Sequence, residues 1–276
     1  MDHTEGTLEG HGGTELYYQR WSPAEAPRAA LAVVHGYAEH SGRYGNVVDW
    51  FVPRHYAVYA FDLRGHGRSA GQRGYIDGWT AVRGDIRALL ERVHEDEPEL
   101  PVFLVGHSLG GMSALNYALH HPNGLQGVVA SGPLLSQLPL PRARLLAGKL
   151  LSRALPRLPM KAELDAADLS RDPDVVEAYR TDPLVFGQGT PRTAMRLIAE
   201  IDWTLAHAGE LALPSLIVHG GADRLARPES SQAFYAGVTF DDRERIEYDG
   251  YYHEVFNEVG KERVLGDVEA WMARHL

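Results

Sequence analysis

One stretch of the sequence decides the fold: Val105-Gly106-His107-Ser108-Leu109-Gly110-Gly111. It places a Gly-x-Ser-x-Gly motif between a short β-prone apolar run, residues 101–105, and apolar residues at helical spacing over 110–121. A sharp turn from strand to helix strains the serine backbone and exposes the hydroxyl, and glycines two residues to either side let neighbouring backbone pass where a Cβ would collide. The motif therefore predicts a nucleophile elbow with Ser108 as the nucleophile.

β-prone runs and helical patterns alternate along the rest of the chain. Expected strands lie at 16–21, 29–35, 57–61, 102–107, 125–130, 215–219 and 243–248, and expected helices at 44–53, 79–95, 110–121, 228–236 and 261–275. Several of the strands are apolar on both faces, as in a parallel sheet that helices cover on both sides. The pattern predicts a doubly wound, mostly parallel α/β sheet.

The segment 133–206 interrupts this alternation. It contains several Leu-rich helical pieces broken by prolines, and no clear strand. Because it follows the strand after the elbow helix, we expect it to lie over the carboxyl ends of the sheet, where α/β proteins bind ligands. We therefore divide the chain into a core of residues 1–132 and 207–276 and a helical cap of residues 133–206.

Length, charge and composition limit the function classes. The 276 residues suit one α/β domain with an insertion, and the net charge of −10 argues against nucleic-acid binding. The absence of cysteine excludes a disulfide, a thiolate nucleophile and a Cys-ligated metal. No apolar run approaches the about 20 residues that span a bilayer, and the first residues do not resemble a signal peptide. We expect a cytoplasmic protein.

The sequence also offers a base and an acid for the serine. A serine hydroxyl is a weak nucleophile near neutral pH, so it needs a base that an acid orients. α/β-Hydrolases use the chain order serine, acid, histidine. Here Asp223 follows the expected strand 215–219, and His253 follows the expected strand 243–248. We expect both beside Ser108, because parallel strands end at one edge of a sheet; Asp249 is the rival acid, expected instead to form a turn with Gly250.

Other polar residues near these motifs are interpreted as structural. His35, His66, His107 and His219 flank glycines and are expected to pack or hydrogen-bond near the site. The loop 64–69 is rich in Gly and Arg, but it matches no phosphate-binding pattern and no helix opens immediately after it. We expect this loop to brace the site.

Several motifs together closely resemble the monoacylglycerol lipase and lysophospholipase group of α/β-hydrolases. They are His35-Gly36-Tyr37-Ala38-Glu39-His40-Ser41-Gly42-Arg43-Tyr44, the stretches 62–69, 106–110 and 253–258, and the cap segments 169–173 and 179–185. The resemblance spans nearly the whole chain. It implies the α/β-hydrolase fold and a serine esterase that acts on one fatty acyl chain joined to a glycerol-like alcohol, without a metal or an organic cofactor.

The same resemblance implies binding residues. The tetrahedral intermediate needs two N–H donors, one from Leu109 after the nucleophile and one, by match to the family, from Tyr37. The family more often has a smaller residue or Phe at position 37, so Tyr37 can narrow the pocket. Glu39 and Arg43 resemble the polar residues that contact the alcohol head group. A buried Glu39–Arg43 ion pair that holds the loop is the alternative interpretation, and both can hold together.

Three classes of function remain open. The first is a monoacylglycerol lipase that forms an acyl-enzyme on Ser108. The second is an enzyme of the same fold acting on another bond or acceptor: a broader lysophospholipase, carboxylesterase or thioesterase, or a peptidase or acyltransferase. The third is a binding module, which would show a damaged triad, whereas all three triad positions are filled here. A peptidase would need an acidic anchor for the substrate amine, which the sequence does not locate.

The cap carries a basic, Leu-rich stretch. Between Arg142 and Lys161 lie six Lys and Arg residues, six leucines and no acidic residue. A helix here would rest its leucines on lipid and its cations on anionic head groups, although Pro156 would interrupt it. Alternatively, most of the leucines pack on the core and the cations form a solvated face. Transient contact of the cap with a membrane or micelle surface is therefore a hypothesis.

Overall fold

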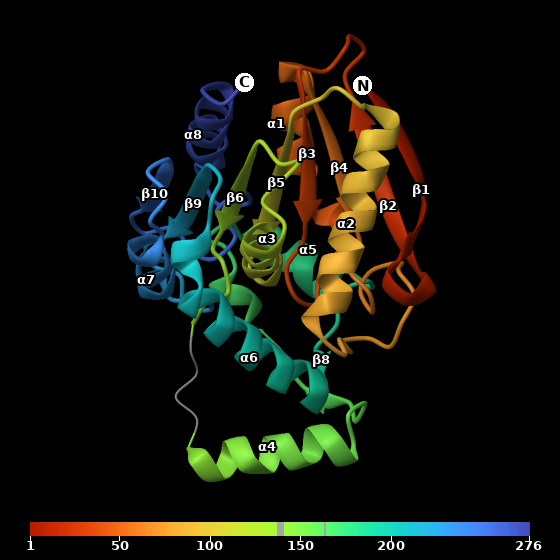
Figure 1. Cartoon of the computed structure of the whole chain (residues 1–276), viewed down its shortest axis with the longest axis vertical. Helices are drawn as coiled ribbons and strands as arrows, with labels where there is room; N and C mark the ends of the chain where they lie inside the picture. Colours follow the sequence, from red (N-terminus) through yellow and green to blue (C-terminus); the bar gives the residue numbers. More distant parts are fainter. Residues whose placement is uncertain (137–140, 163) are drawn as a thin grey trace.

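The main sheet of the computed structural model is mostly parallel, as predicted (Figure 1). The structure describes residues 1–136, 141–162 and 164–276, and within them the strand order is β1-β2-β4-β3-β5-β6-β9-β10. From β4 to β10 neighbouring strands run parallel, while β2 pairs antiparallel with β1 and β4. The strand bounds are β1 Asp2–Gly10, β2 Thr14–Ser22, β3 Ala29–Val34, β4 Tyr56–Phe61, β5 Val102–His107, β6 Gly127–Ser131, β9 Ser215–Gly220 and β10 Arg243–Tyr248.

Helices cover both faces of this sheet. One face packs against α1 (Gly45–Phe51) and α8 (Lys261–Ala273), and the other against α2 (Trp79–Asp96), α3 (Leu109–His120) and α7 (Pro228–Gly237). Successive residues of β3 alternate between the two apolar clusters, and all of them are buried. Two-sided burial thus explains the continuous apolar runs and confirms the doubly wound α/β architecture.

The segment expected to form the cap contains three α-helices, a 3-10 turn over Ala166–Asp168 and a short strand pair among its described residues. The α-helices and strands are α4 (Arg142–Ala154), β7 (Met160–Lys161), α5 (Pro173–Thr181), β8 (Gln188–Gly189) and α6 (Pro191–Ala206). β7 and β8 form an antiparallel pair, so the expectation of no strand here is wrong; two residues per strand are too few to produce an alternating pattern. α4 packs against α6 at the end of the molecule opposite both termini (Figure 1). The division at 133–206 stays a prediction.

Two other differences concern the edges of elements. β1 has no counterpart among the predicted strands, because it is a polar edge strand with mostly exposed residues, bonded only to β2 within the described chain. The helix expected over 44–53 ends at Phe51 and continues as a 3-10 turn over Val52–Arg54. Polar edge strands and helix ends give the weakest sequence signals.

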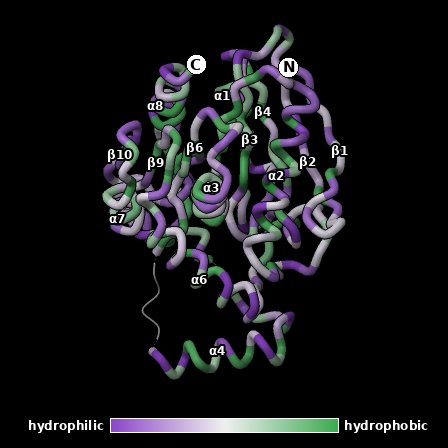
Figure 2. Tube along the Cα trace, in the orientation of Figure 1, coloured by the Kyte–Doolittle hydropathy of each residue, from purple (hydrophilic) through white to green (hydrophobic). Residues whose placement is uncertain are grey.

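Most leucines of the basic stretch are exposed. Their exposed fractions are 60% for Leu146, 58% for Leu150, 52% for Leu155 and 41% for Leu158. Apolar and hydrophilic residues alternate along α4, which ends at Ala154 before Pro156 (Figure 2). The alternative in which most of these leucines pack on the core is therefore wrong. Over the part of the chain that the structure describes, no helix combines the length and apolar character needed to cross a membrane.

Candidate active site

Ser108 lies in the strained turn that the motif predicts, between β5 and α3. Its backbone has φ 53° and ψ −116°, a conformation that an L residue other than glycine rarely adopts. A Cβ on Gly106 would lie 2.2 Å from the Gly110 carbonyl oxygen, and a Cβ on Gly110 would lie 2.0 Å from that of Val34. Only glycine fits at both positions, so the close backbone crossings around Ser108 depend on the motif.

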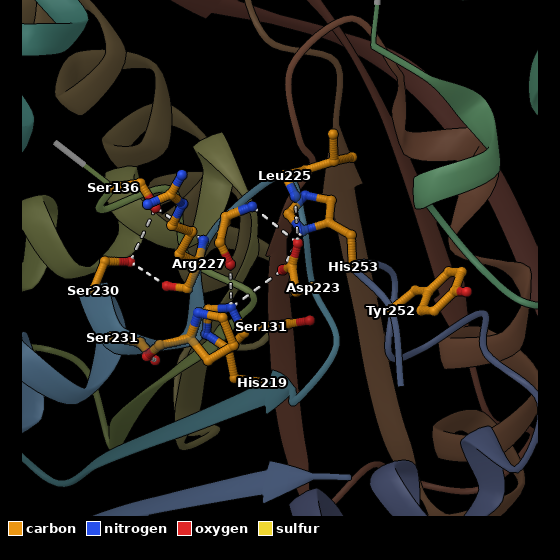
Figure 3. Close-up of polar contacts among 12 residues, drawn as sticks. Ser131, Ser136, His219, Asp223, Leu225, Arg227, Ser230, Ser231, Tyr252 and His253 are labelled. Atoms are coloured by element: carbon orange, nitrogen blue, oxygen red, sulfur yellow. Dashed lines mark hydrogen bonds and ion pairs between the residues drawn. The ribbon is translucent and has the colours of Figure 1, made fainter. Parts of the chain in front are cut away.

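Asp223 and His253 come together after neighbouring parallel strands (Figure 3). Asp223 follows β9, His253 follows β10, and the Asp223 Oδ2 lies 2.7 Å from the His253 Nδ1. The other carboxylate oxygen, Oδ1, accepts hydrogen bonds from the backbone N–H groups of Leu225 and Ala226 at 2.8 and 2.9 Å. Asp249, the rival acid, is exposed and precedes Gly250, whose φ is 72°. The structure therefore pairs His253 with Asp223.

The Asp223 pKa is lowered and the His253 pKa is raised, so the carboxyl group stays ionised and the imidazole becomes more basic. Burial opposes the ionisation of Asp223, but His253 and the hydrogen bonds from two histidines outweigh it and hold the Asp223 pKa well below its usual range. Burial also disfavours a charged His253, yet the Asp223 carboxylate raises the His253 pKa above its ordinary value. His253 is therefore a stronger base than a free imidazole.

Ser108 and His253 line one small cavity, together with Gly36 and Tyr37. Its volume is about 10 Å³, which is the space of about one water molecule. The hydrogen bonds within the described residues do not include one between Ser108 and His253. Such contacts are often long before substrate binds, so the shared cavity is the relevant observation.

The peptide between Gly36 and Tyr37 is held by His35. The Leu63 N–H donates to the His35 Nε2 at 2.9 Å, so the proton of this imidazole is on Nδ1, which donates to the Gly36 carbonyl at 2.7 Å. In a trans peptide the carbonyl and the following N–H point in opposite directions. A Cβ on Gly36 would lie 3.3 Å from the Ser108 Cβ, so this loop passes directly against the elbow. His35 thus fixes the direction of the Tyr37 N–H beside Ser108.

The side chain of Tyr37 joins this loop to the β7–β8 pair. Its hydroxyl donates to the Gln188 carbonyl at 2.7 Å, and its ring contacts that of Phe186 with centroids 5.8 Å apart. The Phe186 N–H in turn donates to the Ala38 carbonyl at 3.2 Å. Burial raises the pKa of Tyr37 to about 12, so its hydroxyl keeps the proton that it donates.

Glu39 and Arg43 form a buried ion pair, and Glu254 completes it. The Arg43 guanidinium binds both oxygens of Glu254 at 2.6 and 2.9 Å and the Glu39 Oε2 at 2.8 Å. The Glu39 Oε1 accepts from the Gly36 N–H at 2.5 Å and from the Tyr44 hydroxyl at 2.9 Å. The structural interpretation of Glu39 and Arg43 is thereby confirmed. We call these three residues, Glu39, Arg43 and Glu254, the carboxylate clamp.

The carboxylate clamp borders the same cavity as Ser108. Burial would raise the pKa of Glu39, but Arg43 and the nearby histidines outweigh burial and hold it at about 2. The Arg43 guanidinium also stacks over the Tyr179 ring of α5, 4.9 Å from its centroid. The clamp therefore links the loop of Tyr37, the loop of His253 and helix α5.

Glu254 and Glu258 carry contacts that the sequence did not assign, although both belong to the motif 253–258. Glu258 is fully buried and accepts from the backbone N–H groups of Tyr252 and Arg171 at 2.9 and 3.0 Å. The Glu254 N–H donates to the Leu169 carbonyl at 2.8 Å. These bonds attach the segment before α5 to the loop of His253.

The loop 64–69 braces the site, as expected, through Asp62 just before it. The Asp62 carboxylate accepts from the Ser41 and Arg68 N–H groups, both at 2.7 Å. Arg64 binds both oxygens of Asp85 on α2 at 2.6 Å, so its guanidinium already has an anionic partner. Among the described residues, no three His, Asp or Glu side chains are grouped so as to hold a metal ion.

A known family and several named relatives match most of the chain. A family model described as serine aminopeptidase, S33, matches residues 25–260. A monoacylglycerol lipase from Mycolicibacterium smegmatis is 37% identical over 99% of this chain and 98% of its own length. The human monoglyceride lipase is 30% identical over 95% of this chain and 88% of its own. This chain belongs to the α/β-hydrolase family that includes these lipases.

A solved member of this family has the same fold. The crystal structure of a monoacylglycerol lipase from Paleococcus ferrophilus superposes with a TM-score of 0.86 at 33% identity, covering 95% of this chain and 100% of that one. The resemblance inferred from the motifs is therefore confirmed. Within this family of serine hydrolases, the geometry around Ser108 decides what the present chain can do.

Proposed function

We propose that this hydrolase cleaves monoacylglycerols to glycerol and free fatty acid, with Ser108 as nucleophile, His253 as base and Asp223 as the acid that orients it. The observation that carries the proposal is the buried Asp223–His253 pair, 2.7 Å apart, whose histidine shares a cavity with the strained Ser108. The whole-length relatives that are named monoacylglycerol lipases support the choice of substrate.

The proposed chemistry follows from these positions. His253 takes the Ser108 proton as the serine oxygen attacks the ester carbonyl, and Asp223 stabilises the resulting imidazolium. The N–H groups of Tyr37 and Leu109 donate to the developing oxyanion. His253 then passes its proton to the departing glycerol oxygen, and water hydrolyses the acyl-enzyme by the same steps in reverse. None of these steps needs a cofactor.

The carboxylate clamp is proposed to contact the glycerol head group as well as to hold the loops. Glu39 and Arg43 line the cavity beside Ser108, and the Glu39 Oε2 accepts only from Arg43 among the hydrogen bonds described above. A glycerol hydroxyl can donate to that oxygen, because each carboxylate oxygen accepts about two hydrogen bonds. A head-group role predicts a larger loss on monoacylglycerol than on p-nitrophenyl butyrate when Glu39 is replaced by Gln.

An aminopeptidase activity, which the family description suggests, needs an acidic anchor for the substrate amine. Among the described residues that line the Ser108 cavity, the carboxylates are those of Glu39 and Glu254, and both already bind Arg43. A lysophospholipase, carboxylesterase, thioesterase or acyltransferase remains compatible with the same triad. Turnover of monoacylglycerols, lysophospholipids, thioesters and amino-acid arylamides separates these activities, and arylamide turnover above ester turnover would overturn the proposal.

We further propose that α4 contacts lipid surfaces transiently. The support is the set of exposed leucines of α4 and the turn after it, flanked by cations with no acidic residue between Arg142 and Lys161. The cavity at Ser108 has room for about one water, so an acyl chain needs more space there than this structure provides. Sedimentation with anionic vesicles at low salt should retain the wild type and release the Arg144→Glu, Arg153→Glu double variant. The cytoplasmic location stays a prediction.

The decisive test of the nucleophile is covalent labelling. Ser108→Ala should lose both ester turnover and labelling by a fluorophosphonate. Ser113→Ala is the matched control, because Ser113 is a buried serine of α3 whose Oγ accepts from the Trp79 indole at 3.1 Å. Retained labelling in Ser108→Ala, or lost labelling in Ser113→Ala alone, contradicts the assignment.

A further inference from the structure

We propose that His219 is a positioning residue for catalysis: it donates a hydrogen bond to Asp223 and keeps that carboxylate ionised and oriented toward His253. The sequence placed His219 near the site without a role. The inference rests on the proposed function, because it assumes that Asp223 is the acid of the triad.

The hydrogen bonds of His219 determine which nitrogen carries its proton. His219 lies near the end of β9 with no exposed surface, and its Nε2 is 2.7 Å from the Ala226 carbonyl and 3.1 Å from the Asp223 Oδ2. A carbonyl oxygen can only accept, so Nε2 must carry the proton. Its N–H is then shared between Ala226 and Asp223. His219 therefore acts toward Asp223 as a donor.

The other ring nitrogen agrees with this tautomer. The His219 Nδ1 is buried and has no hydrogen-bond partner within the described residues. A proton there would be a buried donor without an acceptor, which costs more free energy than a bare ring nitrogen in the same place. The carbonyl at Nε2 and the unpaired position of Nδ1 thus both favour the tautomer with its proton on Nε2.

The Asp223 carboxylate is consequently surrounded by donors (Figure 3). Oδ2 faces the imidazoles of His219 and His253, and Oδ1 accepts the N–H groups of Leu225 and Ala226. A carboxylate has about four lone-pair sites, and these four donors occupy them. The carboxylate cannot rotate toward another partner without leaving at least one donor unpaired.

This arrangement matters when His253 becomes an imidazolium. The carboxylates of Asp223, Glu254 and Glu39 favour the charged form of the His253 ring, and the ring of His107 lies 4.7 Å away. A carboxylate with a second donor is a weaker proton acceptor, because hydrogen bonds to the charged form stabilise that form. The proton that comes from Ser108 therefore stays on His253 until the leaving alcohol takes it.

The test compares two replacements of His219 with one control. In His219→Leu the donor is lost, and kcat for p-nitrophenyl butyrate should fall about tenfold to a hundredfold with KM unchanged, as expected for losing a hydrogen bond to a charged group. In His219→Gln the side-chain amide can donate to Asp223 again, so most of kcat should return. Ser231→Ala is the control: Ser231 is buried on α7 and bonds to Pro228 and Arg245, not to Asp223.

A merely structural role would not produce this pattern. It would lower the melting temperature of both His219 variants and reduce activity in step with stability. A kcat of His219→Leu equal to the wild type, or of His219→Gln as low as His219→Leu, overturns the proposal. Nitrogen-15 NMR of the wild type gives a test that needs no variant: a His219 protonated on Nδ1 and bare on Nε2 also overturns it.

Asp223→Asn separates this inference from the proposed function. Wild-type turnover in Asp223→Asn would refute the triad itself. Lost turnover in Asp223→Asn together with unchanged turnover in His219→Leu would refute only the role of His219.

Discussion

Removal of Arg43 should strongly lower the stability of the fold without touching the proposed triad. Its side chain is 9% exposed and lies between the carboxylates of Glu39 and Glu254, which are 5% and 4% exposed. Arg43→Met keeps the length of the side chain but leaves two buried carboxylates without their cation. Breaking a buried ion pair in this way costs about 3–5 kcal/mol of unfolding free energy.

The pKa of Glu39 gives a second estimate of the unfolding free energy that the ion pair contributes, and it has a similar size. Its value is about 2 in the folded protein, against an ordinary value of 4.5. That difference corresponds to about 3 kcal/mol at neutral pH. A depressed acid pKa stabilises the fold above pH 4.5, and this contribution is lost as the pH falls toward 2. In Arg43→Met the cation that lowers the Glu39 pKa is gone, so burial should raise that pKa above its unfolded value. The variant should therefore become more stable on acidification.

Urea unfolding followed by tryptophan fluorescence between pH 5 and pH 8 measures both effects. The stability deficit of Arg43→Met should be largest at the alkaline end and should shrink toward pH 5. The matched control is Arg92→Met, because Arg92 pairs with Asp96 on the surface of α2 with a side chain 36% exposed and should lose less than about 1 kcal/mol. The triple variant with Glu39→Gln and Glu254→Gln should recover most of the loss. A deficit below that of the control, or one independent of pH, would refute the reasoning.

Three further predictions concern the site. The protonated His253 imidazole cannot accept the Ser108 proton, and its pKa is raised, so kcat/KM should fall on acidification through a pKa above 6.5. In a pH–rate profile, Asp223→Asn should lower that pKa. Ser108→Gly should abolish turnover yet raise the unfolding free energy by about 1 kcal/mol, as measured by urea unfolding. Glycine relieves about 1–3 kcal/mol of backbone strain at φ 53°, which exceeds the cost of the extra conformational entropy of the unfolded chain. Tyr37→Phe loses the hydrogen bond to the Gln188 carbonyl, which is worth about 1 kcal/mol, so the melting temperature should fall slightly. Its kcat should stay near wild type, because the backbone N–H of residue 37 remains.

Local sequence determined the elbow and the strands that lead to it. The spacing of Gly106, Ser108 and Gly110 is a local pattern, because the strained turn and its backbone crossings need small residues at fixed offsets. The apolar strands were also predictable, since burial on both faces of a sheet leaves a continuous run. The strand β1 was not predicted, because its polar, mostly exposed residues give no apolar pattern and its pairing with β2 depends on the tertiary structure.

Tertiary structure alone decided the polar contacts that no order of motifs predicts. The pairing of Asp223 with His253, and the turn at Asp249, were expected from the order of the motifs and the shared edge of parallel strands, and the register of β9 beside β10 agrees. Glu254 reaches Arg43 across 211 positions of the chain, and His219 reaches Asp223 from the end of the same strand that precedes it. Such contacts depend on strand order, twist and packing of distant segments, and these are properties of the whole fold that no local pattern of residues encodes.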